Sequence, residues 1–337
     1  MPLRSRLYLK YLMTLALCLG VKQGFSFEER GLRGRDTSFI GIPAYKWNLR
    51  FQVVNKFSST TFISAIDSIP EARFKPNENF GIGAGIFYKG FGGYLGFSLP
   101  STAQDLRSKG RTRRLDIQIN QYGKKLGIDA QFQYFKGFYL ANSREFVPKI
   151  VLNQPHILRP DLRSFTLGLS GYWIFNSKKY SIKAAFIQTE KQKKSAGSFL
   201  LGYATSLYAF NADSAILPES FRLPGQDEDY QMGRFVSASL SLGYAYCFVM
   251  GKDWYFNIAL MGGGGLLHSK VSYESGGNTR QFDPVLRWQV RSSVGYNGER
   301  RFFGIKAVNE VYGLPLNAAR LSYSFGNLRL FYGFRPF

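Results

Sequence analysis

The sequence predicts an all-β protein, an antiparallel transmembrane β-barrel of about 12–14 strands. In Leu126–Tyr134 (LGIDAQFQY), apolar residues alternate with Gly, Asp and Gln, and successive side chains of a strand point to opposite faces. This pattern recurs almost to the last residue, and aromatics gather near the strand ends. The composition agrees, since 31 Phe, 21 Tyr and 36 Gly among 337 residues are typical of strands and turns. We therefore expect an apolar face toward lipid and a polar face toward the lumen.

Composition and charge limit the other classes of protein. The chain has a negative mean hydropathy and no apolar run near 18 residues, which excludes a polytopic helical membrane protein. Its net charge of +22 indicates an anionic partner. The charge is spread over turns, loops and alternate strand positions instead of one patch, so we expect lipid and lipopolysaccharide phosphates, and no nucleic acid. A soluble β-sandwich remains the alternative fold.

The N-terminus has the features of a secretory signal peptide over residues 1–26. A basic stretch precedes the short apolar run Tyr11–Val21, and Gly24 and Ser26 are small residues placed before a cut at Phe27. A retained anchor is the alternative. We expect export to the periplasm, a periplasmic lead-in over 27–45, and a barrel over 46–337 that the outer-membrane assembly machinery inserts. Removal of the signal leaves Cys247 without a disulfide partner.

The strands expected in the first half of the barrel follow the same alternation. They are Trp47–Val53, a short strand at Thr60–Ile66, the hairpin of Phe80–Tyr88 and Phe91–Leu99 around Lys89-Gly90, Leu115–Asn120, and Leu126–Tyr134. We expect a longer loop over Lys136–Pro160.

The second half continues the pattern with one inconsistency. The expected strands are Phe165–Phe175, Tyr180–Ile187, Phe199–Phe210, Val236–Phe248, Tyr255–Leu260, Leu286–Tyr296, Phe303–Ala307 and Leu321–Phe337. Gly262–Gly265 should end its strand or permit a bulge. Short turns near Gly123, Ser177, Gly251 and Glu299 indicate the periplasmic end, yet the strands between 180 and 248 break the up-down order. Either Phe199–Phe210 is not a full strand, or a long loop lies on the periplasmic side.

Several phrases, spread over most of the mature chain, resemble a known family. They are Phe74-Lys75-Pro76-Asn77, the run Leu115–Leu140 ending in Lys136-Gly137-Phe138-Tyr139, Glu190–Leu200, and Phe325-Gly326-Asn327 followed by Leu328–Phe337. Together they are similar to an uncharacterised outer-membrane family of Bacteroidetes-type bacteria, catalogued as a domain of unknown function. The chain departs from that family at Phe74, where Tyr is usual, and at Pro336. The resemblance implies an outer-membrane barrel and no assigned activity.

The polar face of the strands carries the candidate site residues. Inward positions on one strand, on the strand after it and on an earlier hairpin hold a lumen charge lattice. Its members are Arg287 and Arg291, Lys306 and Glu310, and Asp116 and Asp129. Such a lattice either fills the lumen structurally or forms an anion-selecting constriction. A second set lies at the short turns, as a solvated rim or a contact with lipid phosphates: Lys124, Lys125, Lys178, Lys179, Lys252, Arg300 and Arg301.

Signals for catalysis are weak. A barrel lipase would need Ser, His and an acid within hydrogen-bond reach, and the candidates are Ser195, Ser198 and His268. Asp227, Glu228 and Asp229 lack EF-hand spacing, and two His with one remaining Cys give no zinc site. We expect no metal and no cofactor.

The leading hypothesis is a non-enzymatic outer-membrane barrel, either a narrow channel or an envelope or surface component. A barrel-embedded lipid or lipid-A hydrolase and a scaffold for another envelope protein are the alternatives. The sequence leaves open whether the lumen is open, which solute it would take, and the oligomeric state.

Overall fold

The computed structural model describes residues 34–45, 47–64, 69–88, 91–146, 155–218, 229–316 and 319–336. The expected signal peptide and the start of the lead-in lie outside this set, as does the Lys89-Gly90 turn. The chain divides into two units, Met1–Gly34 and Arg35–Phe337, and every feature below belongs to the second. None of the helices in the described ranges has the length and apolar character of a membrane span.

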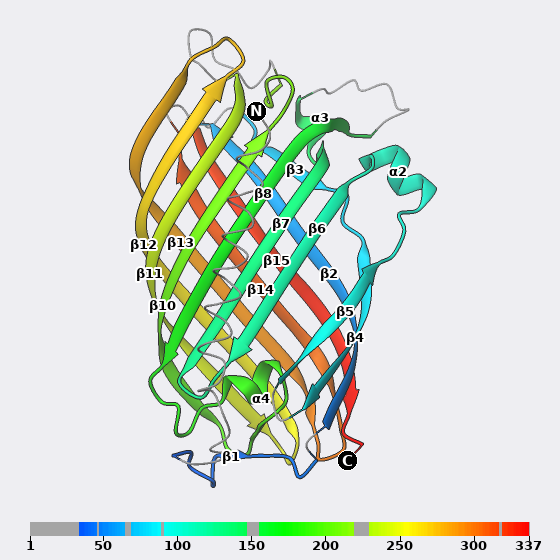
Figure 1. The fold of residues 1–337 in the computed structure, drawn as a ribbon, viewed down its shortest axis with the longest axis vertical. Coiled ribbons are helices and arrows are strands. Elements are labelled where there is room, and N and C mark those ends of the chain that lie inside the picture. Colours follow the sequence, from blue (N-terminus) through cyan, green and yellow to red (C-terminus); the bar gives the residue numbers. More distant parts are fainter. Residues whose placement is uncertain are drawn as a thin grey trace, which may run out of the picture. The chain divides into compact units, whose positions relative to one another are not determined.

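An antiparallel ring of strands encloses the interior (Figure 1). Within the described residues, ten strands pair in sequence around the ring, and the pairing of the last with the first closes it. They are β2 (Trp47–Ser64), β3 (Ala72–Pro76), β7 (Leu126–Leu140), β8 (Ile157–Ile174), β10 (Ala196–Asn211), β11 (Tyr230–Met250), β12 (Trp254–Tyr273), β13 (Asn278–Asn297), β14 (Arg301–Pro315) and β15 (Ala319–Phe334).

The ring is irregular between β2 and β7. The five-residue β3 joins these two strands at one end only, where Phe74 pairs with both Thr60 and Leu140. Further along, β2 pairs with β4 (Phe80–Tyr88), β4 pairs with β5 (Phe91–Ser98), and β7 pairs with β6 (Arg113–Tyr122). In the part of the chain that the structure describes, no pairing joins β5 to β6.

The burial pattern is that of a barrel with an apolar exterior. On β13, Arg287 and Arg291 are buried, whereas Leu286, Trp288 and Val290 between and beside them are 60%, 61% and 42% exposed. A soluble fold would bury the second set and expose the first. Ring closure together with this inversion excludes the β-sandwich alternative, because the apolar rows surround the molecule instead of meeting in a core between two sheets.

The strand predictions are confirmed for most of the chain and wrong at four places. Thr60–Ile66 is not a separate strand, since β2 runs without interruption to Ser64. The loop expected over Lys136–Pro160 is shorter, because β7 continues to Leu140 and β8 begins at Ile157; α3 (Ser143–Phe146) lies between them. The third correction restores the up-down order of the strands between residues 180 and 248. Tyr180–Ile187 is no strand but contains the helix α4 (Ile182–Phe186), and Phe199–Phe210 is a full strand.

The fourth correction concerns Gly262–Gly265, which lies in the middle of β12 and does not end it. The β11 backbone approaches these glycines so closely that a Cβ at Gly263 or Gly265 would overlap the carbonyl oxygens of Leu240 and Ala238. Gly262 and Gly264 face β13 instead, where a Cβ at Gly262 would overlap the Trp288 ring. The glycines therefore continue the strand where its neighbours leave little room for side chains.

Candidate functional site

A folded segment between β8 and β10 fills the barrel at the end of the short turns (Figure 1). It contains α4 and the short strand β9 (Lys191–Gln192), which pairs with β1 (Ile40–Gly41) of the lead-in. We call residues 176–195 the plug. Glu190 of the plug forms a buried ion pair with Arg35 at 2.8 Å and also accepts a hydrogen bond from Ser181. Neither residue was a sequence candidate, although Glu190 begins one of the family-like phrases.

The C-terminal end of α4 points its carbonyl groups at cations of the barrel wall. Lys306 donates to the Phe186 carbonyl at 3.0 Å, and the fully buried Arg50 donates to the Ile187 carbonyl at 2.7 Å. The last carbonyls of a helix lack intrahelical donors and carry partial negative charge. These two cations therefore neutralise the helix end and fix the plug to β2 and β14.

The next residue of the plug, Gln188, has a φ of +52°, a region that residues other than glycine rarely adopt. Its surroundings hold it there: Arg50 and Arg335 donate to its side-chain and backbone oxygens, and its amide donates to Tyr255 at 2.8 Å. The plug is thus fixed at several points on the wall.

Aromatic side chains close the interior at the opposite end. Tyr208 of β10 and Tyr323 of β15 stack across it with ring centroids 4.0 Å apart. Their hydroxyls hydrogen-bond to Thr60 and Thr166 at 2.6 and 2.7 Å. Phe62 packs against rings of two facing strands in the same layer. In the described residues, the interior is therefore packed at both ends.

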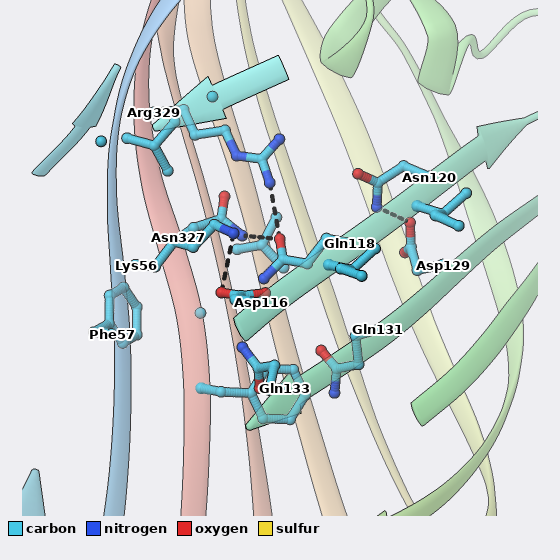
Figure 2. Close-up of a pocket in the computed structure, with 18 of the residues that line it drawn as sticks. Lys56, Phe57, Asp116, Gln118, Asn120, Asp129, Gln131, Gln133, Asn327 and Arg329 are labelled. Carbon is cyan, nitrogen blue, oxygen red and sulfur yellow. Dashed lines mark hydrogen bonds and ion pairs between the residues drawn. The ribbon is translucent and has the colours of Figure 1, made fainter. Parts of the chain in front are cut away.

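Between the plug and this aromatic layer lies a chamber of about 690 Å³ that polar and apolar side chains line together. Its described lining carries amides and charges from β2, β6, β7, β14 and β15, and Figure 2 shows several of these side chains pointing toward one another. The amides among them are Gln52, Gln118, Asn120, Gln121, Gln131, Gln133 and Asn327.

The six residues of the expected lumen lattice all face the interior but form separate groups. Arg291 pairs with Asp129 and donates to the hydroxyls of Tyr172 and Tyr122 at 2.7 and 3.1 Å. Both terminal nitrogens of the guanidinium thereby donate to oxygen acceptors, which stabilises the buried charge.

Arg287 forms a second group with Glu310, at 2.8 Å, and with the Tyr312 hydroxyl, at 3.0 Å. Lys306 binds the plug, as described above. Asp116 forms a third group with Lys56 at 3.0 Å. The lattice thus consists of local ion pairs and a plug anchor, and the residues do not form one ring around an open bore.

Three basic residues of the chamber lining were missed by sequence reasoning, and one of them is Arg114 of β6. Lys56 lies on the unexpected extension of β2, and Arg329 lies on β15, where it donates to Gln118 at 2.9 Å. The signal for Arg329 was present, since it alternates with the outward Leu328 and Leu330.

The chamber reaches the strand edges of β5 and β6. Its lining includes Leu95–Ser98 of β5 and Arg114–Tyr122 of β6, the two strands that do not pair with each other. We call this gap the lateral opening. One end of it is set by two family-like phrases: Asn77 donates to the Gly110 carbonyl at 2.8 Å and to Thr112 through its backbone N–H, and Thr112 donates to the Gly137 carbonyl at 2.7 Å.

Gly137 is required at this corner. Its φ is +92°, and a Cβ there would overlap the Arg111 carbonyl oxygen. The β7 register also shifts between Lys136 and Phe138. This bulge lets the connection carrying α2 (Ala103–Lys109) leave the wall, so that β6 starts away from β5.

The basic turn residues lie together at the plug end. Six of the seven are exposed, and Lys124 is half-buried. Some have aromatic neighbours: Lys125 lies over Trp173 at 5.5 Å, Lys179 over Phe39 at 5.0 Å, and Arg300 donates to the Tyr45 hydroxyl at 2.8 Å.

The hydrolase candidates are not brought together. Ser198 is level with Ala245 on β11 and therefore with Ala259 on β12, and His268 lies nine positions further along β12, roughly 30 Å at the rise of a strand. Ser195 accepts the Val249 N–H, and His268 packs on Phe282 with ring centroids 4.7 Å apart. Nucleophile activation needs direct hydrogen-bond contact, so these three residues form no catalytic group.

Other reactive groups are few. Cys247 is buried, with a free thiol. Among the described residues, no three acidic, His or Cys side chains gather as metal ligands; Asp227 and Glu228 lie outside them.

The closed antiparallel ring, the apolar exterior and the polar interior define a β-barrel of the outer-membrane type. The profile of a family described as "Domain of unknown function (DUF4421)" matches residues 34–335. The chain belongs to this family, which confirms the resemblance drawn from its sequence phrases. A comparison with curated proteins finds no match.

This chain is also similar to several solved structures. The outer-membrane protease OmpT from Escherichia coli has 9% identity and a TM-score of 0.40, covering 86% of this chain and 96% of that one. The toluene transporter TodX of P. putida has 10% identity and a TM-score of 0.26, covering 86% and 90%. The translocator domain of NalP from Neisseria meningitidis has 9% identity and a TM-score of 0.30, covering 87% and 89%.

Proposed function

We propose that this protein is an outer-membrane barrel whose interior binds a molecule from the surrounding membrane and does not conduct solutes along the barrel axis. The observation that carries the proposal is the chamber that is packed off at both ends and bordered by the unpaired edges of β5 and β6. The proposal includes export to the periplasm and a periplasmic position for the plug end, in keeping with the short turns there.

The unpaired edges of β5 and β6 are the second observation that supports a chamber open toward the membrane. An unpaired strand edge leaves backbone N–H and C=O groups without partners, which costs several kcal/mol per group in hydrocarbon. Such edges are tolerated at membrane depth where they line a water-filled cavity. The polar lining of the chamber meets that condition, so the lateral opening can persist in a bilayer.

The ion pairs of the interior argue against an anion-selecting pore. A selective constriction presents its basic side chains to passing ions, whereas Arg291 is directed to Asp129 and Arg287 to Glu310. Lys306 is directed to the plug. The basic residues of the predicted lattice therefore do not form a ring of available cations around an axial pore, and the alternative of an envelope component agrees better with this interior.

Planar-bilayer recording tests the absence of axial conduction. Protein that migrates as a folded species in heat-modifiability gels should give no stepwise current across a broad voltage range. Reproducible single-channel steps from the same folded fraction would refute the closed lumen.

Lipid photocrosslinking tests access through the lateral opening. A lipid with a photoreactive group near its glycerol should label chamber residues such as Gln118 on β6 and Gln131 on β7, in addition to outward residues such as Leu240. Labelling confined to outward positions would show that lipid does not reach the chamber. Partner proteins that co-purify in place of lipid would favour the scaffold alternative.

A further inference from the structure

We propose that the chamber binds the phosphate-bearing head group of a membrane lipid, held by Lys56, Arg114 and Arg329. This inference rests on the proposed lateral access and adds the chemistry of the ligand.

The charges of the chamber favour an anion. Its described lining holds five basic residues and four acidic ones. One of the acids, Glu310, is already paired with Arg287, which lies outside that lining. The chamber and its immediate partners therefore carry more positive than negative charge, and uncompensated charge away from bulk water is costly. An anionic head group would reduce that cost.

The basic residues nearest the lateral opening converge from three strands. Lys56 of β2 lies 3.0 Å from Asp116, and Arg329 of β15 donates to Gln118, two positions further along β6. Arg114 occupies the matching inward position on the other side of Asp116 and lines the chamber. Figure 2 shows Lys56 and Arg329 reaching from their strands toward Asp116 and Gln118 on β6. Three cations on separate strands suit a phosphate, which offers several oxygens at once.

The outer side of the opening suits the acyl chains. Leu95 and Phe97 of β5 are 80% and 78% exposed, and they border both the chamber and an apolar groove on the exterior wall. That groove continues over Phe51, Ile305 and Leu330. A lipid lying across β5 would thus place its phosphate among the chamber cations and its chains against the groove.

Amides complete the head-group environment. Gln118, Gln131 and Asn327 line the chamber beside the cations, and each amide both donates and accepts. They match the ester and hydroxyl groups that adjoin a lipid phosphate, and they would also hydrogen-bond with backbone groups at the exposed edge of β6.

The test compares two photoreactive lipids with identical acyl chains, a phosphatidic acid and a diacylglycerol, in nanodiscs containing the full barrel. Labelled peptides are quantified separately for the chamber face of β6–β7 and for the exterior. We expect the phosphatidic acid to label the chamber about tenfold more than the diacylglycerol does, the effect of roughly one charge-assisted hydrogen bond. Labelling of the exterior should be equal.

Variants separate phosphate binding from general structure. Arg114→Gln and Arg329→Gln should bring the ratio of the two lipids in the chamber close to one, while Arg329→Lys should keep most of it. Lys252→Gln at the exposed turn is the matched control and should leave the ratio unchanged. Heat-modifiability gels confirm that each variant is folded.

The outcomes distinguish the two proposals. Equal labelling of the chamber by both lipids would overturn phosphate recognition and leave lateral access standing. Absence of chamber labelling with either lipid would overturn both. Phosphatidic acid labelling that is confined to the basic turns would show that lipid phosphate binds the rim and not the chamber.

Discussion

Arg291 on β13 and Asp129 on β7 form a buried ion pair across the barrel interior, although 162 positions separate them in the chain. The pair links two walls that share no backbone hydrogen bonds. Removal of one partner leaves the other charge buried, which is more costly than loss of the pair as a whole.

Asp129→Asn should therefore lower the stability of the barrel by about 3 kcal/mol. The measurement is the midpoint of unfolding in detergent, monitored by the shift of the folded band on gels. The control is Asp213→Asn, which breaks an exposed pair with Arg163 and should change stability by less than about 1 kcal/mol. A smaller effect for Asp129 than for Asp213 would contradict the structural role of the interior pair.

Glu190→Gln should loosen the plug. It removes the charge that faces Arg35 and weakens the contact with Ser181, so the segment should open more often while the ring stays closed. Hydrogen exchange of residues 180–192 should become roughly tenfold faster, the effect of about one lost charge-assisted contact, with the strands β11 and β12 unchanged. Asp36→Asn, a half-buried acid next to Arg35 whose carboxylate accepts from Ser38, serves as the control and should leave plug exchange as in the wild type.

Gly265→Ala should destabilise the barrel because its Cβ would overlap the Ala238 carbonyl oxygen of β11. Overpacking of this kind costs about 1–3 kcal/mol. Gly313→Ala on β14 is the matched variant, since no atom lies within 4 Å of its added Cβ. Equal unfolding midpoints for the two variants would mean that β11 and β12 separate readily at Gly265.

The attachment of the plug should weaken in acid through Asp253, in the turn between β11 and β12. Burial opposes ionisation of this carboxyl, but hydrogen bonds from Lys191 and Tyr296 outweigh it and hold the pKa of Asp253 below its usual value. A lowered pKa means that the contact stabilises the folded state above the ordinary pKa and is lost as the pH falls through the lowered one.

Hydrogen exchange at Lys191 and its neighbours, corrected for the intrinsic pH dependence, should accordingly rise below about pH 4. Asp253→Asn should show the faster exchange at neutral pH and lose the acid-dependent step. An unchanged step in that variant would assign the pH dependence to another carboxyl.

The sequence by itself determined the fold class and the inward or outward direction of most side chains. In a strand with period-two alternation, the apolar residues point either all inward or all outward. Because the apolar rows recur over the whole chain, the outward direction is the consistent one for every strand. The alternation alone is therefore enough to place Arg287, Arg291, Lys306 and Glu310 on the interior face. The family phrases likewise led to the correct family.

Only the tertiary structure decided what the interior does. Which charges meet depends on strand order and stagger around the ring, so Asp129 meets Arg291 while Asp116 meets Lys56. The segment at Tyr180–Ile187 alternates well enough to resemble a strand, but β8 and β10 on either side of it pair directly with each other. The buried cations Arg50 and Lys306 hold its helix end inside the barrel. The gap between β5 and β6 follows from the short β3 and the bulge at Gly137. Such departures from regular pairing arise from contacts between distant segments, and a local pattern of apolar and polar residues does not encode them.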